Sequence, residues 1–412
     1  MAEFFAPGIK QNTTMSKPAT GPLSAQDRAW VEDIYGRILI KMKAEAGRIG
    51  SMIPYTTNKV GRYEDVESQE WGLGFWTNGF WPGMLWQMYE ATADESYRKA
   101  ALGVEERLNA LLDSPEKVDH DVGFLFLPTS VANYRKTGDP EGRRRGLLAA
   151  SLLFSRYNLD GHFIRAWPDS MAEMAQTMGN GDVRGWMIID CLMNIPLLYW
   201  ASEETNDPRF AKVAVSHAKT AQQYIVRPDG SCNHIVAFDP DTGEYLTNPR
   251  GQGYQQGSSW SRGQSWAVYG FALSYRHTRD ESFLNTAKQC AHYCIANLAA
   301  NDWLPLVDYR QPAQPLKYDS TAAAITAAGL LEIADHVAEM EKPLYIKAAL
   351  RILQACEKKF CNWDPEADSI VGGGTFFYHD PDGTNTEVPI IYGDYYFIEA
   401  VLRLKGKSLF IW

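Results

Sequence analysis

The sequence predicts an all-α protein folded as a single (α/α)6 barrel, a closed ring in which inner helices alternate with outer ones. Three observations lead to this prediction: a connector motif recurs, apolar helices alternate with amphipathic ones, and the long polar segments all fall in one kind of connection. We expect residues 25–412 to form this one catalytic domain. Residues 1–24 are polar and rich in Pro, Thr and Ser, which is typical of a flexible arm.

The connector motif is a weak internal repeat. It reads TADESY from Thr92, TGDP from Thr137, TNDPRF from Thr205 and TRDESF from Thr278, with a looser EKPLY from Glu341. Gly or Asn after a helix favours a left-handed C-cap, and Asp followed by Pro or Glu favours the start of the next helix. Each connector is therefore predicted to be a tight turn between two helices.

The segments that flank the connectors have helical periodicity. The apolar segments before the connectors, expected as inner helices, are residues 80–91, 125–136, 189–204, 266–277 and 322–339. Amphipathic segments such as 210–225 and 283–298 follow, and residues 26–46 and 392–404 complete the set. Six such hairpins can stack as a solenoid or close into a ring, and the apolar end of the chain, SLFIW, favours closure because it provides no polar cap.

Four long polar insertions lie between an outer helix and the next inner helix: residues 160–184, 227–259, 302–317 and 372–389. On a closed barrel these insertions gather at one end, where the inner helices begin. Loops gathered on a rigid scaffold are the usual place for a functional site. We therefore expect the site at this end.

Composition excludes several classes of protein. The formal net charge is −10 and no Lys/Arg-rich tract is present, so nucleic acid is not an expected partner. No apolar stretch of about 18 residues predicts a membrane span, and residues 1–24 lack the apolar core of a signal peptide, so we expect a cytoplasmic protein. The six cysteines include no CxxC pair; Cys290 and Cys294 are expected to be small buried residues rather than metal ligands.

Two acids stand out at the predicted site end. Asp190 interrupts the apolar run MIIDCLM, where burial is expected to raise its pKa and make it a usable proton donor. Asp121, in HDVGF, lies at the start of the neighbouring inner helix. Two carboxyl groups facing one pocket are typical of sugar-cleaving enzymes. Each acid could instead be a helix cap; Asp319 is expected to be only a cap, and Asp394 to be structural.

Aromatic and cationic side chains accompany these acids. Tryptophans can stack on sugar rings, and those expected near the pocket are Trp76, Trp81, Trp167, Trp260 and Trp266. Arg262 and His234 are candidates to receive a carboxylate of the ligand.

Several motifs, taken together and in order, resemble the unsaturated glucuronyl hydrolases, glycoside hydrolase family 88. They are GFWPGMLW from Gly79, HDVGF from His120, Asp190 with Asn194, DGS with His234, WSRGQSWA from Trp260, Asp319-Ser320 and YGDYY from Tyr392. The resemblance spans residue 30 to the end. It implies an (α/α)6 barrel with no metal or organic cofactor, and an unsaturated uronyl oligosaccharide as the substrate of a monomer or homodimer.

The resemblance also implies roles for single residues. Asp190 would be the general acid/base, which protonates C4 of the substrate's C4=C5 bond, and Asp121 would hold the substrate and tune Asp190. Sugar-contacting positions would be Trp76, His120, Trp167, His234, Gln252, Arg262 and Trp266. Members that accept sulfated fragments carry a Ser/Ser/Lys patch where this chain has FFYHDPDG from Phe376, so we expect a preference for unsulfated substrates.

Three alternatives remain at this point. An unsaturated rhamnogalacturonyl hydrolase would share the barrel and the chemistry but act on pectin fragments. A sugar epimerase on the same barrel would need paired histidines, and the 8 histidines form no clear inward pair in the sequence. A non-catalytic helical scaffold would have no need for a buried Asp190 near Asp121.

Overall fold

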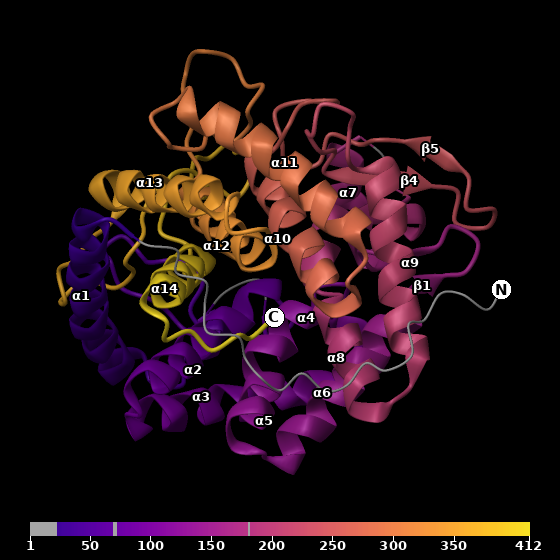
Figure 1. The fold of residues 1–412 in the computed structure, drawn as a ribbon. Helices are drawn as coiled ribbons and strands as arrows, with labels where there is room; N and C mark the ends of the chain where they lie inside the picture. Colours follow the sequence, from indigo (N-terminus) through magenta and orange to yellow (C-terminus); the bar gives the residue numbers. More distant parts are fainter. Residues whose placement is uncertain (1–22, 69–71, 180–181) are drawn as a thin grey trace.

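The computed structural model of the protein describes residues 23–68, 72–179 and 182–412. Most of the predicted N-terminal arm, residues 1–22, lies outside the described residues. Within them, helices form two concentric layers, with six inner helical segments surrounded by six outer helices (Figure 1). The protein is therefore an (α/α)6 barrel, as the repeat predicted.

The inner layer consists of α2 (Phe80–Thr92), α4 (Val122–Phe126) with α5 (Ala132–Thr137), α8 (Pro196–Thr205), α10 (Ser261–Thr278), α12 (Ser320–His336) and α14 (Ile391–Lys405). The outer layer consists of α1 (Ala25–Ile49), α3 (Glu95–Leu108), α6 (Pro140–Ser155), α9 (Pro208–Tyr224), α11 (Glu281–Ala299) and α13 (Lys342–Phe360). The ring closes where α14 packs against α1 and α2.

The connectors fold as their sequences predict. Asp94, Asp139, Asp207 and Asp280 cap the outer helices, each accepting a hydrogen bond from the backbone N–H two residues ahead. The inner helices end on left-handed residues at Ala93, Gly138, Asn206 and Arg279. These tight turns gather at one end of the barrel, called here the closed end.

The last five residues cover the closed end at the centre of the ring (Figure 1). Trp412 is 2% exposed, stacks on Tyr396 and donates its indole N–H to Glu399 at 2.9 Å. Leu409 and Gln87 exchange backbone and side-chain hydrogen bonds. The apolar character of this segment therefore reflects its burial across the barrel axis.

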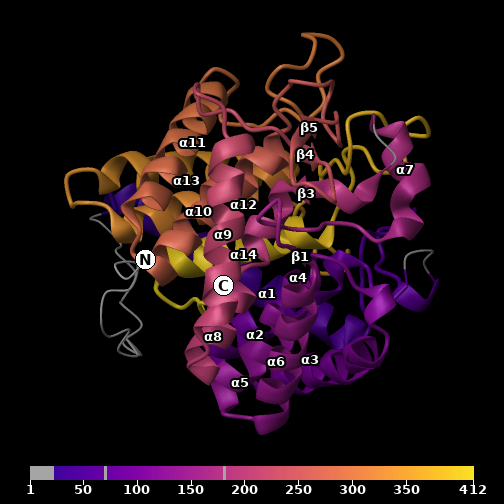
Figure 2. The same ribbon diagram turned by 90° about the vertical axis from the view of Figure 1, so that its right-hand side faces the viewer.

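The other end, called here the open end, carries the insertions. They contain α7 (Ala172–Thr177), the hairpin of β1 (Tyr157–Asn158) and β2 (Phe163–Ile164), and a sheet of β3 (Trp186–Ile188), β4 (Ile235–Phe238) and β5 (Tyr245–Thr247). Figure 2 shows α7 at this end, beyond the sheet.

The third inner helix departs from the prediction of one helix over 189–204. Residues Ile189–Met193 form a 3-10 turn that directly follows β3, and α8 begins at Pro196. Pro196 cannot donate a backbone hydrogen bond and so begins a helix well but does not continue one. Asp190 consequently lies on the turn between a strand and a helix.

Cys290 and Cys294 are buried in α11, and all six cysteines of the chain are free thiols, as the sequence predicted for the helical pair. Among the described helices, none combines the length and the apolarity that a membrane span needs.

Candidate active site

A cavity of 740 Å³ opens among the insertions at the open end. Of the predicted site residues, seven line it: Trp76, His120, Asp121, Trp167, Asp190, His234 and Gln252. Arg262 and Trp266 do not line it. Trp81 and Trp260, which were also expected near the pocket, are buried and do not line it either. Sequence reasoning missed other lining residues, namely Tyr55, Asp119, Met171, Met174, Met178, Arg250, Phe376 and Phe377.

The register of the small sheet places His234 beside Asp190. Ile188 in β3 pairs with Ile235 in β4, and the backbone N–H of Ile189 donates to the carbonyl of His234 at 3.1 Å. The Nε2 atom of His234 consequently lies 3.6 Å from the Asp190 carboxylate. The backbone N–H of Gln252 donates to Nδ1 of His234 at 2.9 Å, so in the neutral ring the proton is on Nε2 and points toward Asp190.

Asn194 connects the two acids. Its side-chain amide donates to Oδ1 of Asp121 at 2.8 Å and to the carbonyl of Asp190 at 3.2 Å. Its oxygen accepts from the backbone N–H of Phe124 at 2.7 Å. A Cβ on Gly123 would lie 2.6 Å from the Cα of Asn194, so the glycine of HDVGF permits this approach. The four-residue spacing from Asp190 was the available signal for Asn194.

The electrostatics of the acid pair differ from the sequence-based expectation. Burial favours the neutral form of Asp190, but His234, His120 and Arg262 together outweigh it and lower its pKa. The expected rise in the pKa of Asp190 is therefore wrong for the unliganded protein. Burial and the neighbouring carboxylates of Asp119 and Asp190 instead raise the pKa of Asp121 well above its ordinary value.

Two histidines lie at this pair, although the sequence showed no clear inward pair. His120 is 1% exposed, and its Nε2 lies 3.4 Å from Asp121. Burial lowers the pKa of His120 to about 3 and lowers that of His234 as well. Burial therefore favours the neutral form of both rings.

Ligand atoms of Asp119, His120 and Asp121 lie within 4.8 Å of one another, a spacing compatible with a cation. A metal would require an ionised Asp121.

Arg262 lies behind the cavity wall. It is 1% exposed, pairs with Asp319 at 2.9 Å and donates to the carbonyls of Thr375 and Phe376. Asp319 caps α12, as predicted, but the expectation that it is only a cap is wrong, because its carboxylate also pairs with Arg262. Asp394 accepts from Tyr63, Ser369 and two backbone N–H groups, so it is structural, as expected.

The aromatic wall of the cavity has two layers. Trp76 faces the cavity, with its ring centroid 6.5 Å from that of Trp266, which stands edge-on behind it. Trp167 lines the cavity from the insertion after α6 and packs against Trp186 at 5.5 Å. Rings held in this way offer rigid faces to a sugar.

Two buried carboxyl groups beside aromatic faces, at the open end of a helical barrel, are the kind of side chains that glycoside hydrolysis needs. The model of Glycosyl Hydrolase Family 88 matches residues 48–301, more than half of the chain. The chain belongs to this family and is a glycoside hydrolase.

Curated relatives agree with this assignment. The chain is 36% identical over 370 residues to an unsaturated glucuronyl hydrolase of Bacillus sp. (strain GL1), with 89% of this chain and 94% of the relative covered. It is 35% identical to an unsaturated chondroitin disaccharide hydrolase of Streptococcus pneumoniae (strain ATCC BAA-255 / R6), with 82% and 83% covered. A solved structure of an unsaturated glucuronyl hydrolase variant with dGlcA-Glc-Rha-Glc is similar with a TM-score of 0.82 and 35% identity, covering 90% and 96%.

Proposed function

We propose that the protein removes the 4,5-unsaturated glucuronate from the non-reducing end of oligosaccharides that polysaccharide lyases produce. The observation that carries the proposal is the pair of buried acids, Asp121 and Asp190, at a cavity with tryptophan faces. Asn194 holds the two residues together, because its amide donates to the carboxylate of Asp121 and to the backbone carbonyl of Asp190. The names of the relatives support the substrate class.

In the proposed reaction Asp190 donates a proton to C4 of the substrate. The C4=C5 bond and the ring oxygen form a vinyl ether, so protonation leaves positive charge shared between C5 and that oxygen. An ionised Asp121 stabilises this cation. Water adds at C5 and returns a proton to Asp190, and the resulting hemiketal opens and releases the neighbouring sugar.

The electrostatics suggest how the proton reaches Asp190. Two coupled acids can share one proton, and in the unliganded protein the raised pKa of Asp121 and the lowered pKa of Asp190 favour the proton on Asp121. The substrate adds its own carboxylate beside His234 and Gln252. That negative charge raises the pKa of Asp190, which then takes the proton and leaves Asp121 ionised for catalysis.

The remaining predicted residues have positioning roles in this proposal. Trp76 and Trp167 stack on the sugars, and His120, His234 and Gln252 donate or accept hydrogen bonds at the cavity wall. Trp266 supports Trp76 from behind. Arg262 contributes positive potential through the wall, because its own donors are directed to Asp319 and two carbonyls.

We also propose that unsulfated substrates are preferred. The loop over 376–389 contains no Lys or Arg. It contributes Phe376, Phe377, His379 and Asn385 to the cavity, and Asp380 accepts hydrogen bonds from Asn385 and Thr386. A sulfate needs cations or several donors. Equal kcat/KM on sulfated and unsulfated disaccharides would contradict this preference.

The test follows the ultraviolet absorbance of the C4=C5 bond conjugated to the carboxylate, with unsulfated unsaturated chondroitin or hyaluronan disaccharide. We expect wild-type protein to remove the signal and Asp190→Asn to lose about a thousandfold in kcat, since acid/base groups contribute roughly 10²–10⁴. The exposed Arg209→Gln serves as the control. Turnover is expected to survive a chelator, and a near-normal rate in Asp190→Asn would sink the assignment.

A further inference from the structure

The outer part of the cavity has a wall that the proposed reaction does not use. This wall, called here the α7 wall, consists of residues 168–178 from the insertion after α6 (Figure 2). Met171, Met174 and Met178 follow one another at spacings of three and four, so they share one helical face, and all three line the cavity. Methionines make an adaptable apolar surface against which ligands of varied shape can pack.

Arg250 stands beside this wall. Its backbone N–H donates to the carbonyl of Met178 at 3.1 Å, and its guanidinium donates to the carbonyl of Thr177 at 3.0 Å. The side chain is half-buried and lines the cavity. It pairs with no carboxylate among the residues that the structure describes.

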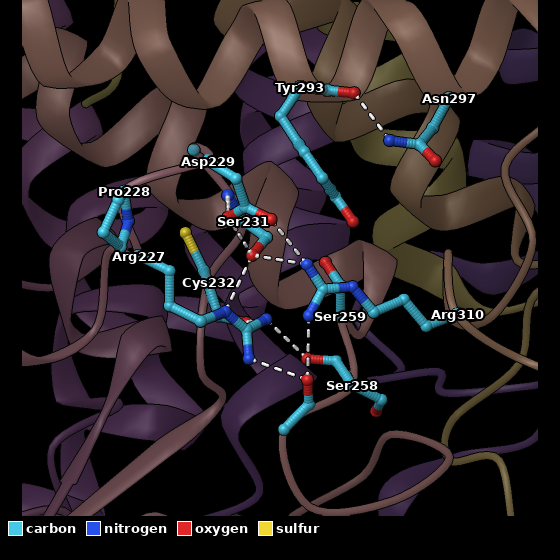
Figure 3. Close-up of polar contacts among 12 residues, drawn as sticks. Arg227, Pro228, Asp229, Ser231, Cys232, Ser258, Ser259, Tyr293, Asn297 and Arg310 are labelled. Atoms are coloured by element: carbon cyan, nitrogen blue, oxygen red, sulfur yellow. Dashed lines mark hydrogen bonds and ion pairs between the residues drawn. The ribbon is translucent and has the colours of Figure 1, made fainter.

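Neighbouring arginines at the open end differ from Arg250. Figure 3 shows Arg227 and Arg310, whose guanidinium groups bond to Ser231, to Asp229 and to backbone carbonyls. Arg262 likewise pairs with Asp319. These arginines hold the loops together. Among the described residues, the guanidinium of Arg250 makes one hydrogen bond, to the carbonyl of Thr177, and its other donors remain available to a ligand.

Arg250 is linked along the chain to the residues that contact the acids. It precedes Gly251, where a Cβ would lie 2.0 Å from Nδ1 of His234, and His234 in turn faces Asp190. Arg250 thus lies two residues before Gln252, whose backbone N–H donates to His234, and contacts the α7 wall through Met178. Lys117 also lines the cavity, but it is exposed on a short 3-10 turn.

We propose that the α7 wall and Arg250 form an outer subsite that binds the sugars beyond the scissile linkage, with Arg250 receiving the carboxylate of a second uronate. In a glycosaminoglycan-type chain every second sugar is a uronate, so one neutral sugar separates the unsaturated residue from the next carboxylate. The neutral sugar packs on the methionines. A cavity of 740 Å³ lies in the upper part of the range of roughly 300–1,000 Å³ for ligand sites, which leaves room beyond the first ring.

This inference rests on the proposed function and names its substrate as an oligosaccharide of at least three sugars, with the second uronate in third place. The experiment compares kcat/KM for unsaturated hyaluronan tetrasaccharide and disaccharide in wild type, Arg250→Gln, Arg250→Lys and the control Arg209→Gln. We expect wild type to prefer the tetrasaccharide. Arg250→Gln should lower kcat/KM for the tetrasaccharide about tenfold or more, which is the size of a lost charged hydrogen bond. It should change kcat/KM for the disaccharide by less than about twofold. Arg250→Lys should recover part of the loss.

Three results would overturn the inference: equal losses on both substrates, no loss on either, or a loss confined to a sulfated disaccharide, which would make Arg250 a sulfate ligand. A binding measurement tests the subsite separately from the proposed function. Calorimetry measures the affinity for the saturated trisaccharide GlcNAc-GlcA-GlcNAc and for the neutral GlcNAc trimer. If wild type cleaves no substrate, the proposed function fails. The calorimetry then decides the subsite: Arg250→Gln should weaken the binding of the acidic trisaccharide and leave the binding of the neutral trimer unchanged.

Discussion

The two ends of the barrel place buried carboxyl groups in opposite settings. At the closed end Glu332 accepts from Arg276, from Arg403 at 2.7 Å and from His336 at 2.8 Å, and these cations outweigh burial and hold its pKa well below the ordinary value. At the open end Asp121 faces two other carboxyl groups, and its pKa is raised. The first arrangement stabilises the fold, whereas the second keeps a proton available for chemistry.

The largest effect is expected at the closed end. Glu332→Gln removes the buried carboxylate that Arg276 and Arg403 share and leaves Arg403 with Asp335 and Glu399. Removing one partner of a buried ion pair costs up to about 3–5 kcal/mol. We expect a fall of this size in the free energy of unfolding, measured with denaturant, while kcat of the folded fraction stays unchanged. Glu203→Gln is the matched control, because Glu203 pairs with His277 at 3.0 Å but is 43% exposed and should cost less than about 1 kcal/mol.

The comparison would fail if Glu332→Gln lowered kcat while leaving stability intact. That result would place the closed-end network in the catalytic step.

At the open end, replacing a buried carboxyl group is expected to raise the free energy of unfolding instead of lowering it. Because the folded-state pKa of Asp121 is raised, wild type loses stability relative to Asp121→Asn as pH rises from about 4 through that pKa. Asp121→Asn should therefore raise the free energy of unfolding at pH 8 by about 1 kcal/mol, with no gain at pH 3. Thermal unfolding at the two pH values measures this difference, and a destabilised variant at pH 8 would contradict the assigned setting.

The same substitution tests the shared proton. We expect a residual activity of about a hundredth of wild type or less. The alkaline limb of its pH profile should lie at lower pH than that of wild type. The neutral amide no longer raises the pKa at which Asp190 loses its proton. An unmoved alkaline limb would show that the two acids are not coupled.

Local sequence predicted the closed end better than the open end. The connectors could be predicted because caps depend on residues two or three apart, as at Asp139 and Gly138. Asp121 and Asp190 could be placed in one cavity because each lies where an inner helix begins. The pairing of Arg262 with Asp319 could not be predicted, since the two residues lie 57 positions apart in the sequence.

The order of the two pKa values was equally inaccessible to local reasoning. It depends on the register of β3 with β4, which brings His234 to Asp190, and on Asp119, which the HDVGF motif does not include. The α7 wall has no counterpart in the helical repeat, so its position follows only from the fold.

The smallest expected effect concerns Asp119 and separates its charge from its hydrogen bond. The backbone N–H of Asp121 donates to Oδ1 of Asp119 at 2.8 Å, and an asparagine oxygen can accept the same bond. Asp119→Asn therefore removes one negative charge from the surroundings of Asp121 and preserves the local geometry. The carboxyl of Asp190, the amide of Asn194 and the cation of Arg156 continue to act on Asp121. The alkaline limb of kcat/KM should move to lower pH by less than in Asp121→Asn, with KM at the optimum nearly unchanged. A changed KM with an unmoved limb would mean that Asp119 contacts the sugar and is not one of the charges that distinguish the open end from the closed end.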